Sequence, residues 1–274
     1  MTQAVLAQRL LQLHQGSEPV LFANCWDAAS ARVLQECGMP AVATSSAAIA
    51  NTLGYADGQR IGREEMFAAV RRITRAVSVP VSADCEAGYA SDAAGVAETT
   101  RLLLATGAVG MNLEDSIEDE SKLVPLERQV ENIKAVRTAA AAAGVHLVLN
   151  ARVDAFFLHS TPPADPFAEA VKRMRAYRAA GADCIFTPGV TDLDVIRRLL
   201  HESPGPLNLL CGPGTPTVAE LRDAGIRRIS VGSKPYLAAL ALLRRTAEEM
   251  RTTGSFAPLA GGLTYAEVNG WLRN

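Results

Sequence analysis

Short apolar runs recur along the chain, and each is followed by a stretch of helical periodicity. The runs are rich in leucine and β-branched residues and rarely alternate with polar ones, which is typical of parallel strands covered on both faces. The pattern predicts eight strands, at about 20–24, 41–44, 80–83, 109–113, 146–150, 183–187, 207–210 and 228–231.

The intervening segments have the spacing of amphipathic helices. Met66, Val70 and Ile73 fall on one face of a predicted helix, as do Ala170 and Met174 of another. Several of these helices end at a glycine, which accepts the left-handed conformation that closes a helix. These glycines are Gly38, Gly107, Gly144, Gly181 and Gly225.

Eight strand–helix alternations with short connections predict a (β/α)8 TIM barrel rather than an open, doubly wound sheet. No G-x-G-x-x-G follows the first strand, which removes the main argument for a dinucleotide-binding fold. We expect residues 1–274 to form a single barrel domain with an N-terminal helix and a C-terminal helical tail at about 252–274. Tyr265 and Trp271 in this tail are expected to pack on the barrel or on a neighbouring subunit.

Composition narrows the class of protein. The net charge is −2 and the hydrophobic fraction 49%, so neither a nucleic-acid partner nor a membrane surface is indicated. The five cysteines are odd in number and form no C-x-x-C pair, and the N-terminus lacks the pattern of a signal peptide. We therefore expect a cytoplasmic enzyme with reduced thiols.

Acidic residues gather where neighbouring strands end. Asp84 and Glu86 follow the third strand, Glu114 and Asp115 follow the fourth, and Asp57 lies in the long polar loop after the second. In a barrel these positions meet at the catalytic end. If the backbone stays extended, Asp84 and Glu86 point the same way. Converging carboxylates predict a Mg²⁺ or Mn²⁺ site, and the alternative is a set of solvated loop acids.

Other side chains admit two interpretations each. Arg152 after the fifth strand can clamp a substrate carboxylate, or pair with Asp154 or Asp84. Ser45 and Ser46 can bind a carboxylate, or serve ordinary turn chemistry. The histidines show no ligand spacing, and two of them are expected on helix surfaces. These are His14 and His201.

Six motifs in order carry a family resemblance. SSAA, LGYAD, DCEAGY, NLEDS, NARVDAF and GADCIFTPG, within about residues 18–250, resemble the phosphoenolpyruvate mutase/isocitrate lyase superfamily, and especially its phosphonomutase-like members. The resemblance implies a Mg²⁺-binding barrel that holds a 2-oxo or 2-hydroxy carboxylate. It also implies a homo-oligomer, tetramer or dimer, whose last helix is exchanged between subunits.

The resemblance also implies roles for individual residues. Metal ligands fall on Asp84, Glu86 and Glu114. Catalytic roles fall on Arg152 and on Asp57, the latter as a direct or water-mediated metal partner. Substrate-binding residues fall on Ser45, Ser46, Ala47, Asp84 and Arg152.

One stretch departs from the family pattern. Isocitrate lyase-type members carry a catalytic cysteine after the fourth strand, whereas residues 115–126 contain neither cysteine nor histidine. Only Ser116, Ser121 and Lys122 are candidate replacements. The leading hypothesis is metal-dependent cleavage or formation of a C–C bond through an enolate. The alternatives are P–C bond chemistry on phosphonopyruvate-like substrates, a 2-oxo-acid binding protein without catalysis, and a Schiff-base aldolase using Lys234.

Overall fold

The computed structural model describes residues 1–117, 121–158, 160–202 and 205–273. Eight parallel strands form one sheet in the order β1-β10-β9-β8-β7-β4-β3-β2. Their bounds are Val20–Phe22 (β1), Val42–Ala43 (β2), Val81–Asp84 (β3), Gly110–Leu113 (β4), Val148–Arg152 (β7), Cys184–Phe186 (β8), Leu207–Leu210 (β9) and Arg228–Ser230 (β10). A parallel bridge between Cys25 and Thr44 joins the two edges of the sheet, so the barrel is nearly closed.

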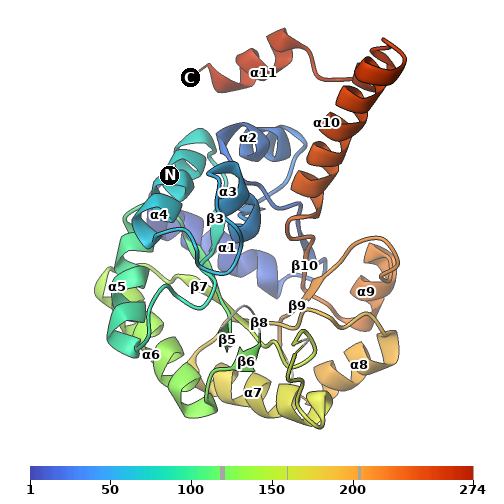
Figure 1. The fold of residues 1–274 in the computed structure, drawn as a ribbon. Helices are drawn as coiled ribbons and strands as arrows, with labels where there is room; N and C mark the ends of the chain where they lie inside the picture. The colour runs from blue at the N-terminus through green and yellow to red at the C-terminus, as the bar shows by residue number, and fades with distance from the viewer. Residues whose placement is uncertain (118–120, 159, 203–204, 274) are drawn as a thin grey trace.

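Helices surround the strands, as Figure 1 shows. They are α1 (Gln3–Gln15), α2 (Ala28–Glu36), α3 (Ser46–Thr52), α4 (Arg63–Ala76), α5 (Ala93–Leu104), α6 (Leu126–Ala142), α7 (Pro166–Ala180), α8 (Leu193–Glu202), α9 (Val218–Ala224), α10 (Lys234–Thr252) and α11 (Tyr265–Leu272), with a 3₁₀ turn, η1, at Ala257–Leu259. All eight predicted strands are found within one or two residues of their expected positions, and the predicted (β/α)8 barrel is confirmed.

Two short elements lie where only loops were expected. The segment after β2 begins with helix α3, so the prediction of a polar loop was wrong for residues 46–52. The N-cap residue Ser45 accepts a hydrogen bond from the Ala48 backbone N–H at 3.3 Å. After β4, an antiparallel hairpin pairs β5 (Ser116–Ile117) with β6 (Lys122–Leu123). Both elements flank the carboxyl ends of the barrel strands, where they can shape a site.

Helix α1 packs across the opposite end of the barrel. Gln3 donates hydrogen bonds to the carbonyl groups of Leu104 and Ala108, just before β4. Leu10 is fully buried, and so is His14, which is 1% exposed. The expectation of His14 on a helix surface was therefore wrong, because it continues the inward face of α1; exposed His201 agrees with the expectation.

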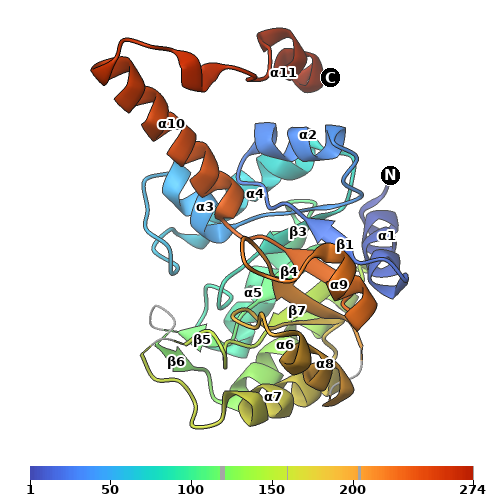
Figure 2. The same ribbon diagram turned by 90° about the vertical axis from the view of Figure 1, so that its right-hand side faces the viewer.

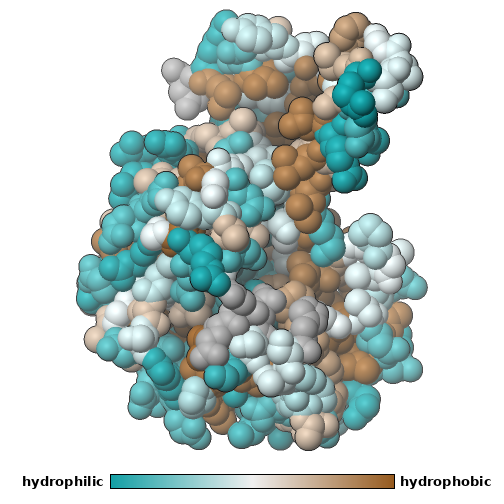
Figure 3. All heavy atoms as spheres, viewed as in Figure 1, coloured by the Kyte–Doolittle hydropathy of each residue, from teal (hydrophilic) through white to brown (hydrophobic). Residues whose placement is uncertain are grey.

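Helix α10 leaves the barrel and carries the chain away from it, as Figures 1 and 2 show, and α11 then returns to contact α2. Figure 3 shows apolar side chains along α10 and on the tail face turned toward the barrel. Tyr265 in the tail is 85% exposed. None of the helices in the described residues is long and apolar enough to cross a membrane.

Candidate active site

A cavity of about 590 Å³ opens at the carboxyl ends of β2, β3, β4 and β7. Five of the predicted site residues line it: Ser46, Asp57, Glu86, Glu114 and Arg152. The other lining residues belong to the loop before α4 and to the start of the β5–β6 hairpin, and they are Ala56, Gly58, Gln59, Arg60, Ser116 and Ile117. The strand-end rule for barrel enzymes therefore located the cavity correctly.

Asp84, the last residue of β3, lies beside this cavity and holds the start of α3. Its Oδ2 atom accepts a hydrogen bond from the Ser46 backbone N–H at 3.2 Å and another from the Ser46 hydroxyl at 2.9 Å. Its own N–H donates to the Thr44 hydroxyl at 2.9 Å. A carboxylate is favoured at a helix N-terminus. Ser45 and Ala47 do not line the cavity, so their roles in substrate binding stay predictions.

Glu86 is fixed by an unusual local backbone. Gln59, Glu86 and Tyr89 are the three non-glycine residues of the described chain with positive φ, at 57°, 47° and 52°. The Gln59 N–H donates to Glu86 Oε2 at 2.5 Å, and the Tyr89 hydroxyl donates to Oε1 at 2.7 Å. The Tyr89 N–H donates to the Gln59 side chain at 2.7 Å. Such backbone costs of order 1 kcal/mol per residue and persists where surrounding bonds enforce it.

This geometry corrects one expectation. The backbone at Glu86 is left-handed rather than extended, because β3 ends at Asp84 and a tight turn follows. Asp84 therefore contacts α3, whereas Glu86 contacts the loop before α4. Cys85 between them is fully buried in the hydrophobic core.

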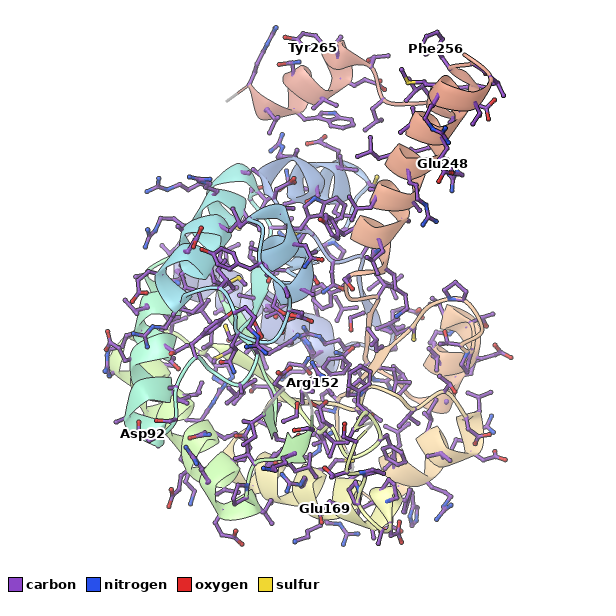
Figure 4. All side chains as sticks on the ribbon, in the orientation of Figure 1. Asp92, Arg152, Glu169, Glu248, Phe256 and Tyr265 are labelled. Carbon is purple, nitrogen blue, oxygen red and sulfur yellow. The ribbon has the colours of Figure 1, made fainter. Side chains whose placement is uncertain are left out.

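Arg152, the last residue of β7, combines both interpretations that the sequence left open. It lines the cavity, and it also forms ion pairs at 2.5 Å through Nη1 with Glu114 and through Nε with Asp154. Asp154 was one expected partner; the other, Asp84, bonds to Ser46. The Arg152 guanidinium lies 5.0 Å from the Phe157 ring centroid. Figure 4 shows Arg152 within the ring of helices at the barrel mouth.

A second layer of buried side chains holds this arrangement. The Ser116 hydroxyl donates to Asp154, and the Asp154 N–H donates to Asp115 at 2.8 Å. The other oxygen of Asp115 accepts from Tyr177 at 2.7 Å and from Arg173 at 3.0 Å. The end of β4, the base of the hairpin and α7 are thus bonded together behind the cavity wall.

The carboxylates of the site repel one another. Burial raises the pKa of Glu86 to about 7, with further contributions from Asp84 and Asp57. Burial also raises the pKa of Glu114 well above its ordinary value, against the opposing effect of Arg152. A cation among these groups would favour their ionised forms.

The donors therefore suit a hard divalent cation, but their side chains have other partners here. Glu114 faces Arg152, Asp84 faces Ser46, and Glu86 faces Gln59. Accordingly, no three Asp, Glu, His or Cys side chains in the described parts of the chain already surround a common metal position. Binding of a metal would require these carboxylates to exchange partners.

Sequence reasoning missed Gln59 and Arg60, both in the wall of the cavity. The only signal was the length of the loop that follows α3. Neither residue type marks a ligand site by itself, and the left-handed backbone of Gln59 cannot be read from its neighbours.

A barrel with acids and an arginine at its strand ends matches a known enzyme family. The family model of phosphoenolpyruvate phosphomutase matches residues 10–251, and the chain belongs to this family, within the phosphoenolpyruvate mutase/isocitrate lyase superfamily.

Three similar proteins illustrate the range of the family. A solved protein of Burkholderia cenocepacia, provisionally named a phosphonomutase, is 38% identical with a TM-score of 0.85, over 90% of this chain and 99% of that one. Oxaloacetate decarboxylase of Rhodopseudomonas palustris is 30% identical over 92% of this chain and 87% of its own. The 2-methylisocitrate lyase of Salmonella typhimurium is 27% identical over 85% and 79%. The protein is thus an enzyme with a lyase or mutase activity.

Proposed function

We propose that this enzyme decarboxylates a small 2-oxo dicarboxylic acid of the oxaloacetate type, with Mg²⁺ or Mn²⁺. The observation that carries the proposal is the guanidinium of Arg152, 13% exposed and held at the wall of an acidic cavity by Glu114 and Asp154. The similarity to oxaloacetate decarboxylase supports the substrate class.

The chemistry needs one electron sink. When the bond between C3 and its carboxylate breaks, the electron pair moves toward the C2 carbonyl and leaves an enolate and CO2. Arg152 is placed to share the charge that develops on the C2 oxygen. The buried Asp154 carboxylate holds the Arg152 guanidinium in place in advance, so the guanidinium needs little reorganisation during the reaction.

Asp84, Glu86 and Glu114 would hold the divalent cation, and Asp57 would contact it directly or through water. When bound, such a cation polarises the 2-oxo group of the substrate as a Lewis acid. The carboxylate oxygens of these residues are the donors that Mg²⁺ and Mn²⁺ prefer. The Ser46 hydroxyl lines the cavity and would bind the substrate carboxylate, with Ser45 and Ala47 shaping the same turn.

Residues 115–126 favour decarboxylation over aldol-type cleavage. Cleavage of a 2-hydroxy acid needs one group to remove the hydroxyl proton and another to protonate the departing enolate. Decarboxylation releases CO2 and needs neither group while the bond breaks. The absence of cysteine and histidine from this stretch therefore fits loss of CO2.

The five cysteines are unpaired, which supports the expectation of a cytoplasmic enzyme.

The test is turnover of oxaloacetate with Mg²⁺ or Mn²⁺, followed by proton NMR and corrected for metal-catalysed decarboxylation without enzyme. We expect pyruvate and CO2 to form and EDTA to stop the reaction. Arg152→Met should lower kcat/KM by about 10²–10³-fold, the usual effect of removing a group that stabilises an oxyanion. Glu114→Gln should weaken metal activation.

Matched controls come from an exposed ion pair on α5, Glu98 and Arg101, whose atoms lie 2.7 Å apart. Glu98→Gln and Arg101→Met should keep wild-type activity. Full activity of Arg152→Met would refute the proposal. Isocitrate, methylisocitrate and phosphonopyruvate complete the panel. Conversion of phosphonopyruvate alone, seen by phosphorus NMR, would assign P–C bond chemistry instead.

A further inference from the structure

A second cavity, of about 610 Å³, adjoins the first. Its walls come from the loop before α4, the turn after β3, the β5–β6 hairpin and the first turns of α6. Gln59 and Ile117 line both cavities and form the partition between them. This neighbouring space takes no part in the reaction proposed above.

The second cavity has the opposite charge to the first. The lining of the first includes three acids and two arginines, whereas that of the second includes Arg63 and Arg128 and, among the described residues, no acid. Arg63 donates to the Thr99 hydroxyl at 3.1 Å and lies 3.9 Å from Glu64, and its Nε atom is buried without a hydrogen-bond partner in the described structure. Arg63 and Arg128 line the same cavity, each from the first turn of a different helix.

Both helices begin without a side-chain cap. Helix α4 follows Gly62 and α6 follows Pro125, and neither residue has a side chain that can accept a hydrogen bond from the first turn. The first amide groups of α4 and α6 add partial positive charge to that of Arg63 and Arg128. Glu64 and Glu65 in the first turn of α4 and Glu127 in that of α6 offset part of this charge, but none of the three lines the cavity. An anion would be stabilised here.

Below the arginines, the cavity floor is largely apolar and buried. It includes Ile61, Ala87 and Val124. Asn132 also lines the cavity and is 5% exposed. Its Nδ2 donates to Gln129 at 3.0 Å, while its Oδ1 is buried without a partner among the described residues. A buried acceptor without a donor is costly, so we expect a water molecule in this cavity to donate a hydrogen bond to Asn132 Oδ1.

We propose that the second cavity binds an amphipathic organic acid: a carboxylate that pairs with Arg63 and Arg128, on an apolar body that packs against Ile61 and Val124. The floor favours such a ligand over an inorganic anion, because burial of apolar surface adds to the charge pairing. Its occupant would contact Gln59, whose backbone N–H holds Glu86 in the first cavity. The site does not depend on which reaction the first cavity performs.

The test is direct binding of acetate, butyrate, hexanoate and phosphate to the full-length protein in EDTA, by isothermal titration calorimetry and ligand-observed NMR. With one site, affinity should rise about fourfold per methylene, the worth of about 0.8 kcal/mol of buried CH₂. Hexanoate should therefore bind more tightly than phosphate. Because no metal or turnover is involved, failure of the proposed reaction leaves this result unaffected.

Variants locate the site. Arg63→Met with Arg128→Met should weaken hexanoate binding at least about tenfold, the loss of a charge-assisted pair. Arg101→Met, on the exposed face of α5, and Arg152→Met, in the first cavity, should leave it unchanged. Arg128 is exposed at a helix start, so Arg128→Met alone remains informative should the double variant fail to fold.

Three outcomes would overturn the proposal. One is the absence of saturable hexanoate binding up to about 10 mM, a concentration that corresponds to very weak affinity. Another is equal affinity for acetate, hexanoate and phosphate. The third is loss of binding in Arg152→Met but not in Arg128→Met, which would place the ligand in the first cavity.

Discussion

His14 and Arg228 meet at the end of the barrel that α1 covers, where neither side chain reaches solvent. His14 Nδ1 carries the proton, because it lies 2.8 Å from the Leu10 carbonyl, which can only accept. Its Nε2 atom faces the Arg228 guanidinium at 3.4 Å. Burial, and then the charge of Arg228, lower the pKa of His14 to about 4, so the imidazole is neutral at neutral pH.

This histidine should make folding stability depend on acid pH. The unfolded chain binds a proton to His14 below a pKa of 6.5, whereas the folded chain does so only below about 4. The contribution of His14 to stability is therefore constant above about pH 6.5 and falls as the pH drops toward 4, by roughly 3 kcal/mol in total. Urea denaturation of wild type and His14→Gln between pH 7 and 4.5 measures the effect.

The variant should lose less stability than the wild type over this range. His201→Gln is the matched control, since His201 is 87% exposed, and it should follow the wild-type profile. Parallel profiles for wild type and His14→Gln would contradict this expectation, because they would show that His14 binds its proton over the same pH range in the folded and unfolded chains.

Two sets of residues show how much of this structure could be predicted from the sequence at the residue scale. Arg152, Glu114 and Asp57 were placed at the cavity by the position of barrel strands alone. His14 was misplaced although Ala7, Leu10 and His14 follow helical spacing on one buried face. Polarity was given more weight there than periodicity, and the buried partner Arg228 lies far away in sequence.

At the scale of elements, the strands could be predicted because most are short stretches rich in apolar residues that alternate along the chain with helical patterns. The 7-residue α3 and the two-residue strands β5 and β6 could not, because tertiary contacts hold them. The N-terminus of α3 is bonded to Asp84. The hairpin is bonded to Asp115 through the Val124 N–H at 2.7 Å. These contacts also determine the shape of the cavity mouth.

Gly110 at the start of β4 shows how closely α1 packs on the strands. A Cβ atom at this position would lie 2.7 Å from the Ser82 hydroxyl and 2.8 Å from Leu10 Cδ2. Gly110→Ala should therefore destabilise the protein by about 1–3 kcal/mol, as overpacked cores do. Thermal and urea unfolding measure the change.

Gly270 is the matched control in an uncrowded helix. It lies in the interior of α11, and a Cβ atom at this position would have no heavy atom of the described residues within 4 Å beyond its own helix backbone and chain neighbours. Gly270→Ala should be neutral or stabilise this helix by up to about 1 kcal/mol. Equal stability of Gly110→Ala and wild type would show that α1 does not press on β4.

At the scale of the whole molecule, α10 and the tail expose an unusual amount of apolar surface. Leu237, Leu240 and Leu243 on α10 are 52%, 42% and 64% exposed, and Phe256 and Tyr265 in the tail are also exposed. Figures 1 and 3 show that this surface belongs to the part of the chain that stands away from the barrel. Exposed apolar patches of this kind mark interaction sites.

The expected partner is a second copy of the chain, in a homo-oligomer of two or four subunits. Light scattering after size exclusion should give a multiple of the 29.0 kDa chain mass.

Leu240→Lys with Leu243→Lys should shift the protein toward monomer, because two charges cannot be buried in an apolar interface without large cost. The barrel itself should stay folded, since these side chains lie on its exposed extension. Arg251→Glu, near the end of α10, tests whether any change of charge on this helix has the same effect. A wild-type protein of 29.0 kDa at all concentrations would refute the expectation, and the exposed surface of α10 would then need another partner.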